Sequence, residues 1–187
     1  MMMISGNNFQ FGQRRTKYSY YFSRYAHIWG WATWRRAWEL YNADMKFWPE
    51  LEGGQWLEDI LRGDEYAVRF WKEKFQAVRA GDIDTWDYLW LLSIWVQNGL
   101  SITPNHNLVS NIGFGPAATH TKSEKQLRAN MATHPMPFPL EHPPFVIRDS
   151  KADRATERRI FKHTCSQHLF KRVLARATLL REILVHS

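Results

Sequence analysis

The sequence predicts an α/β fold, on three observations. A short apolar run at residues 1–6 stops at Gly6 and Asn7, which is typical of a buried strand. Two consecutive segments, residues 64–80 and 84–97, have the composition and spacing of helices. Residues 100–103, directly after them, again have the composition of a strand. Strands that precede and follow helices indicate a mixed α/β domain.

The two helices are bounded by local signals. Asp64 is expected to cap the first helix and Gly81 to end it. Asp84 is expected to cap the second helix, and Asn98-Gly99 to end it. The first helix should bury the face formed by Tyr66, Phe70, Trp71, Lys74 (through its aliphatic stem) and Phe75.

The remaining segments are shorter or irregular. We expect a short helix over residues 33–41 with Thr33 as its N-cap, a strand at 108–110 and a glycine-containing loop at 111–121. Residues 132–150 are proline-rich and predict an extended linker. Residues 151–187 predict a basic amphipathic helix. The expected organisation is therefore a domain at 1–131, the linker and a helical tail at 151–187.

All ten tryptophans lie between Trp29 and Trp95, and four of them fall within residues 29–38. Each indole buries roughly 150–250 Å² and carries an N–H that needs a partner. Four indoles in so short a segment indicate the floor of a site that stacks flat, hydroxylated molecules such as sugars. The alternative is a core cluster, and we expect part of the set to be core, with three candidates: Trp38, Trp71 and Trp95.

Charge and composition restrict the function further. The net charge of +7 comes from the ends, because residues 1–28 and 151–187 are basic and the tryptophan-rich middle is slightly acidic. A nucleic-acid-binding protein more usually places its charge beside its aromatic residues, so we expect no nucleic-acid partner. A single cysteine, Cys165, fits a reducing compartment. We see no signal peptide, and the longest apolar run is shorter than the roughly 20 residues of a membrane span. The expected location is cytoplasmic.

Three blocks then resemble a known family. They are Tyr21-Phe-Ser-Arg-Tyr-Ala-His-Ile-Trp-Gly-Trp-Ala-Thr-Trp-Arg-Arg-Ala-Trp38, Asp84-Thr-Trp-Asp-Tyr-Leu-Trp90, and Ser110-Asn-Ile-Gly-Phe-Gly115 followed by His120. In this order they resemble the C-terminal half of bacterial family-2-like glycosyltransferases, which are nucleotide-diphospho-sugar transferases of the GT-A fold. A more distant likeness is to N-acetylglucosaminyltransferase I. The resemblance implies transfer of a sugar from a nucleotide-sugar donor to a glycan or lipid-linked acceptor, with inversion.

The chain also departs from this family. Such enzymes begin with a nucleotide-binding half that ends in an apolar strand and an Asp-x-Asp motif, which holds a divalent metal, Mn²⁺ or Mg²⁺, on the donor diphosphate. Asp82-Ile-Asp84 matches the Asp-x-Asp motif, but it follows a predicted helix and Gly81 and not an apolar strand. We therefore interpret it as a turn. We therefore expect the acceptor half of a GT-A domain without its donor half, inactive alone, unable to bind UDP- or GDP-sugars, and with no metal or other cofactor in this chain.

The resemblance assigns site residues. Asp87 corresponds to the general base, and the start of a helix favours its charged form. Asp84 is the fallback base, and the alternative is that Asp87 is only a helix-start charge. We expect an acceptor site of Trp29, Gly30, Trp31, Trp34, Arg35, Trp86 and Trp90, in which Arg35 or Arg36 faces an acidic or phosphorylated acceptor. A donor-covering loop would contain Asn111, Phe114, Gly115 and His120.

Rival interpretations remain open. A non-catalytic carbohydrate-binding module would use the same tryptophans and leave Asp87 without a role. A peripheral scaffold could dock through the tail at 151–187. That tail either lies on an anionic membrane at its cytoplasmic face or packs on the body of the protein or on a partner.

Overall fold

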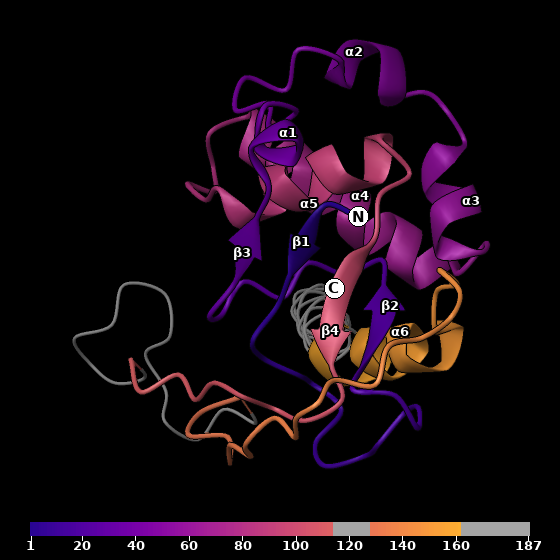
Figure 1. Cartoon of the computed structure of the whole chain (residues 1–187). Coiled ribbons are helices and arrows are strands. Elements are labelled where there is room, and N and C mark those ends of the chain that lie inside the picture. The colour runs from indigo at the N-terminus through magenta and orange to yellow at the C-terminus, as the bar shows by residue number, and fades with distance from the viewer. Residues whose placement is uncertain (114–127, 162–187) are drawn as a thin grey trace, which may run out of the picture.

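The computed structural model describes residues 1–113 and 128–161 of the chain. A four-stranded sheet forms one layer, and helices pack behind it and above it (Figure 1). The strands are β1 (Met3–Ile4), β2 (Tyr20–Ser23), β3 (Ala32–Thr33) and β4 (Ser101–Pro104). The helices are α1 (Arg35–Trp38), α2 (Trp48–Leu51), α3 (Trp56–Leu61), α4 (Glu65–Arg79), α5 (Asp87–Val96) and α6 (Ser150–Thr156), which a π-helical turn, η1 (Glu157–Phe161), continues. The predicted α/β class is confirmed.

The sheet is mixed, with strand order β2-β4-β1-β3. β1 and β4 run parallel, and both outer strands are antiparallel to their neighbours. The connections that follow β1 and β4 meet at the carboxyl ends of these two parallel strands. There the Leu108 amide donates to the Gly6 carbonyl at 2.9 Å, and the Asn8 amide donates to the Asn107 side chain at 3.0 Å. The carboxyl ends of parallel strands are where α/β proteins usually bind ligands.

The core lies between the sheet and the pair α4–α5. Its largest fully buried side chains include Trp71, Trp90, Tyr25 and Phe75. Trp71 contacts aromatic rings from several elements, including Trp95, with ring centroids 5.1 Å apart. The prediction that Trp71 and Trp95 belong to the core is confirmed.

The first long helix agrees with its sequence signals. The Asp64 side chain caps α4 by accepting from the Ala67 amide, and Gly81 follows the helix with a φ of +81°. One detail was wrong: Tyr66 is exposed, because it lies on the solvent side of α4. Asn98, with a positive φ, and Gly99 end α5 as predicted.

Two predicted helix starts were wrong. Thr33 belongs to β3 and its hydroxyl donates to the Met2 carbonyl at 2.6 Å, so pairing with β1 takes it out of the helix that begins at Arg35. Asp84 lies in an exposed turn, and α5 begins only at Asp87. In addition, residues 108–110 form no strand, although they lie beside the connection that follows β1.

The proline-rich segment and the start of the tail pack on the body. α6 contacts β2, and η1 contacts α4. The Asp153 carboxylate lies 3.9 Å from the Arg24 guanidinium and 3.4 Å from that of Arg148, and it accepts a hydrogen bond from Ser23. The rest of the predicted tail helix, with Cys165, lies outside the described residues. Within the described residues, no helix is long and apolar enough to cross a bilayer.

Candidate functional site

Asp87 is the first residue of α5 and is half-buried. Its Oδ1 atom accepts hydrogen bonds from the Thr85 hydroxyl and from the Tyr88 amide, the latter at 2.9 Å. The position at the N-terminus of the helix favours a negative charge. The carboxylate is therefore held in one orientation by its own turn.

Several indole rings contact one another around the residue that precedes Asp87. Trp86, which immediately precedes it, stacks on Trp31 with ring centroids 5.2 Å apart and an angle of 24° between the planes. Trp31 also contacts Trp90 at 5.9 Å. Trp90 itself is fully buried, so it supports the other rings from behind and does not line a ligand site as predicted.

Trp38 and Tyr41 complete the aromatic group. Their rings are stacked with centroids 4.6 Å apart and nearly parallel planes, at 7°, and Trp38 contacts Trp90 with ring centroids 5.4 Å apart. The prediction that Trp38 is a core residue was wrong, because 43% of its surface is exposed. Burial, and secondly the charge of Asp87, raise the pKa of Tyr41, so this phenol lies within the electrostatic reach of the carboxylate.

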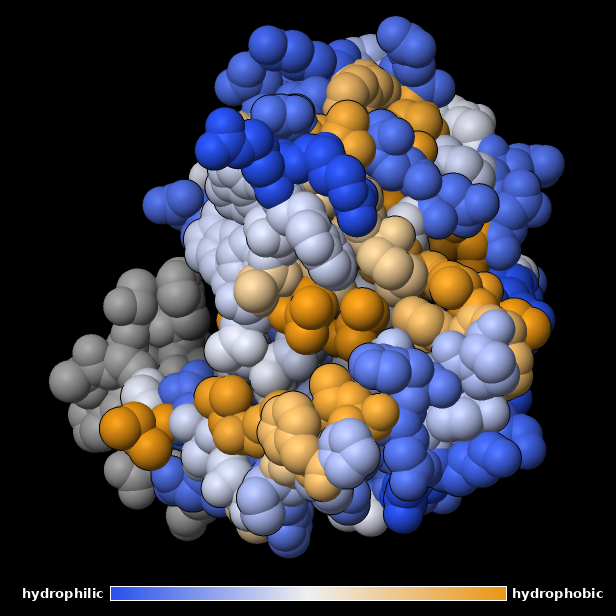
Figure 2. All heavy atoms as spheres, in the orientation of Figure 1, coloured by the Kyte–Doolittle hydropathy of each residue, from blue (hydrophilic) through white to orange (hydrophobic). Residues whose placement is uncertain are grey.

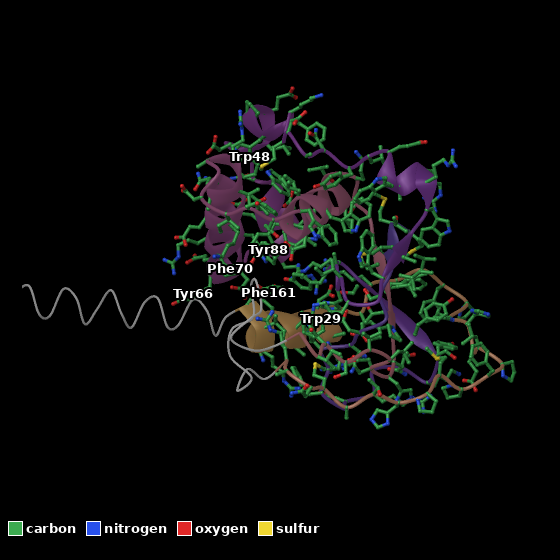
Figure 3. The ribbon with its side chains drawn as sticks, turned by 90° about the vertical axis from the view of Figure 1, so that its left-hand side faces the viewer. Trp29, Trp48, Tyr66, Phe70, Tyr88 and Phe161 are labelled. Carbon is green, nitrogen blue, oxygen red and sulfur yellow. The ribbon has the colours of Figure 1, made fainter. Side chains whose placement is uncertain are left out.

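Tyr88 and Arg128 also interact electrostatically with Asp87. Burial first, and then the Asp87 charge, raise the pKa of Tyr88, whereas Arg128 acts to lower it. Burial lowers the pKa of Arg128, and both Tyr88 and Asp87 counteract that shift. Tyr88 points into the interior, where its ring meets Trp71 edge-on at 5.7 Å, and Figure 3 labels it near Phe70 and Phe161.

Sequence reasoning missed Tyr41, Tyr88 and Arg128 as members of this site. Tyr88 lies inside one of the three blocks that resemble the glycosyltransferase family. Its position directly after Asp87 could have indicated that it belongs to the site. Arg128 had no such signal, because its position beside Asp87 depends on how a distant segment returns to α5.

Several predicted acceptor residues lie elsewhere. Trp29 packs edge-on against Phe9, with ring centroids 5.2 Å apart. Gly30 has a φ of +57°, and a Cβ there would come within 2.5 Å of the Val109 side chain, so its conformation serves close packing of the connections after β1 and β4. Trp34 and Arg35 are exposed, and the Arg36 guanidinium lies over the Trp34 ring at 5.1 Å.

The predicted donor loop is described only at its start. Asn111 is half-buried, and its side chain accepts from the Gly113 amide at 2.8 Å. Phe114, Gly115 and His120 lie outside the described residues. In the part of the chain that the structure describes, no group of three or more His, Cys, Asp or Glu side chains could hold a metal ion.

Comparison of the chain with protein-family models, curated proteins and solved structures finds no match.

Proposed function

We propose that this chain forms the acceptor side of an inverting glycosyltransferase, in which Asp87 is the general base. The single observation that carries the proposal is the placement of Asp87: a half-buried carboxylate, held by its own turn, directly follows Trp86, whose ring stacks on Trp31. Acceptor activation needs a carboxylate that is held still, and a sugar needs a flat apolar surface.

The proposed step uses the Asp87 oxygen that its own turn does not hold. Oδ1 is occupied by Thr85 and Tyr88, which leaves Oδ2 to face the acceptor hydroxyl. As the hydroxyl oxygen attacks the anomeric carbon of the donor, its proton passes to Oδ2. The bond to the nucleoside diphosphate breaks, and that leaving group takes the electron pair.

The aromatic rings would bind the acceptor. Trp86 is 41% exposed, so it can offer a ring surface while Trp31 supports it. The exposed Trp38 and the half-buried Tyr41 form a second stacked pair whose phenol is within reach of the Asp87 charge. Two stacked pairs beside one carboxylate suit a molecule with apolar ring faces and a rim of hydroxyls.

The nucleotide-sugar donor would bind mainly to residues outside this site. Asp82 and Asp84 lie exposed in the turn between α4 and α5, away from any apolar strand end. No step is therefore assigned to a metal held by the described residues. The expected acceptor is a glycan or a lipid-linked saccharide, at the cytoplasmic face of a membrane in the second case.

The decisive variant is Asp87→Asn, with Asp82→Asn as a control of equal chemistry in the neighbouring turn. Transfer of radiolabelled sugar should be measured after the chain is combined with a donor-binding half, and acceptor binding should be measured on the chain alone. We expect Asp87→Asn to lower transfer by about 10²- to 10⁴-fold and to leave acceptor binding unchanged.

The control should leave both quantities unchanged. If the Asp87→Asn protein transfers sugar normally, Asp87 is not the base, and Asp84→Asn then tests the fallback. If acceptors bind but no combination transfers sugar, a carbohydrate-binding module is the better description.

A further inference from the structure

The two faces of the sheet have different surroundings. Met3, Ser101, Thr103 and Tyr21 lie on the inner face and are buried beneath helices. The outer face carries a cross-strand row in which Phe22 is paired with Ile102, Ile102 with Ile4, and Ile4 with Ala32. Figure 3 shows the long helices α4 and α5, and α6, on one side of the sheet. All-parallel sheets are usually covered on both faces, whereas antiparallel sheets often leave one face open.

The outer face is apolar and partly open. Phe22 is buried near the proline-rich segment, whereas Ile4 is 41% exposed and Ala32 is exposed as well. Trp34, two residues beyond Ala32 in an extended conformation, continues this face. Exposed apolar side chains also come from the segment that runs beside β2, at Phe145, Val146 and Ile147. Figure 2 shows a band of apolar side chains across this view of the molecule.

Charge is divided between the two layers. Residues 1–38, which supply three of the four strands, contain no acidic side chain and six basic ones: Arg14, Arg15, Lys17, Arg24, Arg35 and Arg36. Residues 39–87, which supply helices α2 to α4, contain twelve acidic and six basic side chains. Arg24 is buried with Asp153, so the other five provide the positive charge at the surface of the sheet layer. Residues 1–38 are thus basic, and the segment that supplies α2 to α4 is acidic.

The basic groups adjoin the apolar band at both ends. Arg36 lies over Trp34, next to the β1–β3 end of the row. Lys17 lies 5.3 Å from the centre of the Tyr18 ring, which in turn meets Phe145 edge-on at 6.1 Å. Cations beside exposed aromatic and aliphatic side chains match the boundary between lipid headgroups and acyl chains.

We propose that this outer face (Ile4, Ala32, Trp34 and residues 145–147, flanked by Lys17, Arg35 and Arg36) docks on an anionic lipid bilayer. An acidic glycan or a nucleic acid would satisfy the cations but would leave Ile4, Val146 and Ile147 without apolar contact. A bilayer takes up both, through its anionic headgroups and the acyl region beneath them. This inference goes beyond the proposed function and does not depend on Asp87.

The test is sedimentation of the full chain with vesicles of phosphatidylcholine alone or of phosphatidylcholine with about 30% phosphatidylglycerol, an anionic lipid. We expect binding only to the anionic vesicles, weakened at high salt because surface charges are screened. Arg35→Glu/Arg36→Glu should weaken binding by about 30-fold or more, since each basic residue near an anionic surface contributes about fivefold. Arg69→Glu/Lys72→Glu makes the same charge change on exposed positions of α4 and should have less than a threefold effect.

The apolar contribution is tested by Val146→Ser/Ile147→Ser, which should also weaken binding to anionic vesicles. The control is Tyr66→Ser on the helix side, which should leave binding unchanged. Residues 162–187 remain intact in every variant. If both charge reversals, or both serine sets, weaken binding equally, the outer face is not the docking surface. The proposal is also overturned if the chain binds neutral and anionic vesicles equally, or binds neither kind of vesicle. The same holds if the chain dimerises and the outer-face variants abolish the dimer. Circular dichroism spectra that match the wild type ensure that every variant is folded.

Discussion

Trp31 and Trp86 are stacked on each other with ring centroids 5.2 Å apart, although Trp31 directly precedes β3 and Trp86 directly precedes α5. This contact joins the tryptophan-rich segment to the residue that precedes Asp87. The carboxylate held by Thr85 therefore directly follows a residue of the ring platform in the chain. Substitution of individual rings should distinguish the residues of this platform from the tryptophans that only stabilise the fold.

Replacing Trp86 should weaken acceptor binding. Trp86→Ala removes a 41%-exposed ring from the stacked pair, and we expect a loss of about threefold to tenfold in affinity, the usual value of an aromatic contact beyond its buried area. Trp34→Ala is the matched control, since Trp34 is 36% exposed but pairs with Arg36 instead. Calorimetric titration with neutral oligosaccharides measures both. Equal losses would argue against the Trp31–Trp86 platform.

Thr85 should act through Asp87. Its hydroxyl donates to Asp87 Oδ1, so Thr85→Val frees the carboxylate to rotate. We expect the transfer rate to fall about tenfold with little change in acceptor affinity, the pattern of a misplaced reacting group. Thr85→Ser keeps the hydroxyl and should retain most of the rate. A serine variant as slow as the valine variant would contradict this role.

The tryptophans should divide by burial in their effect on stability. Trp71→Ala removes a ring with 1% exposure and should lower the free energy of unfolding by about 3–5 kcal/mol. Trp38→Ala removes a ring that is 43% exposed and should cost clearly less, about 1–2 kcal/mol. Urea unfolding followed by circular dichroism measures both values. Similar costs would mean that Trp38 is a core residue after all.

Asp153 should make the protein less stable as pH rises. Burial raises its pKa to about 6 from 3.8, although Ser23, Arg24 and Arg148 counteract the shift. The folded state then keeps a proton that the unfolded chain has already released. The contribution of Asp153 to the free energy of unfolding is complete below about pH 4 and is lost as the pH rises through 6.

Asp153→Asn removes this titration. The difference in unfolding free energy, wild type minus variant, should therefore fall by about 2–3 kcal/mol between pH 4 and pH 7. Denaturant unfolding at several pH values measures it, and a difference that does not change with pH would refute the assignment.

His27 should act in the opposite direction. It is fully buried beside Phe9, and burial lowers its pKa to about 4 from 6.5. The unfolded chain binds a proton in this range that the folded chain rejects, so stability falls as the pH falls from 6.5 to 4. In His27→Phe this part of the acid sensitivity should be absent. A variant that loses stability with acid as steeply as the wild type would show that other groups are responsible.

Local signals predicted the parts of the fold that depend on neighbouring residues. Asp64 and Gly81 bound α4, and Asn98-Gly99 ends α5, because caps and positive-φ stops act within one turn. Asp84 failed as a cap because the chain continues through a turn before α5 begins at Asp87. Thr33 failed because pairing with β1, over 28 residues away, outweighed its local preference.

In the candidate site, too, some of the predicted residues lie together and others lie elsewhere. Three blocks of residues predicted Asp87 and its indole neighbours, and the structure places Trp31 and Trp86 together. It places Trp29, Gly30 and Trp34 in other contacts, since the direction of each side chain depends on strand pairing and on the path of the connections.

The sequence by itself determined the α/β class, the bounds of α4, the end of α5 and the abundance of indoles around one carboxylate, because these follow from composition and from interactions a few residues apart. Only the tertiary structure decided which rings are buried, that Tyr41 and Arg128 approach Asp87, and that one apolar, basic-edged sheet face lies open. Those properties depend on contacts between segments far apart in the chain, and periodicity within a segment does not encode which partner it meets.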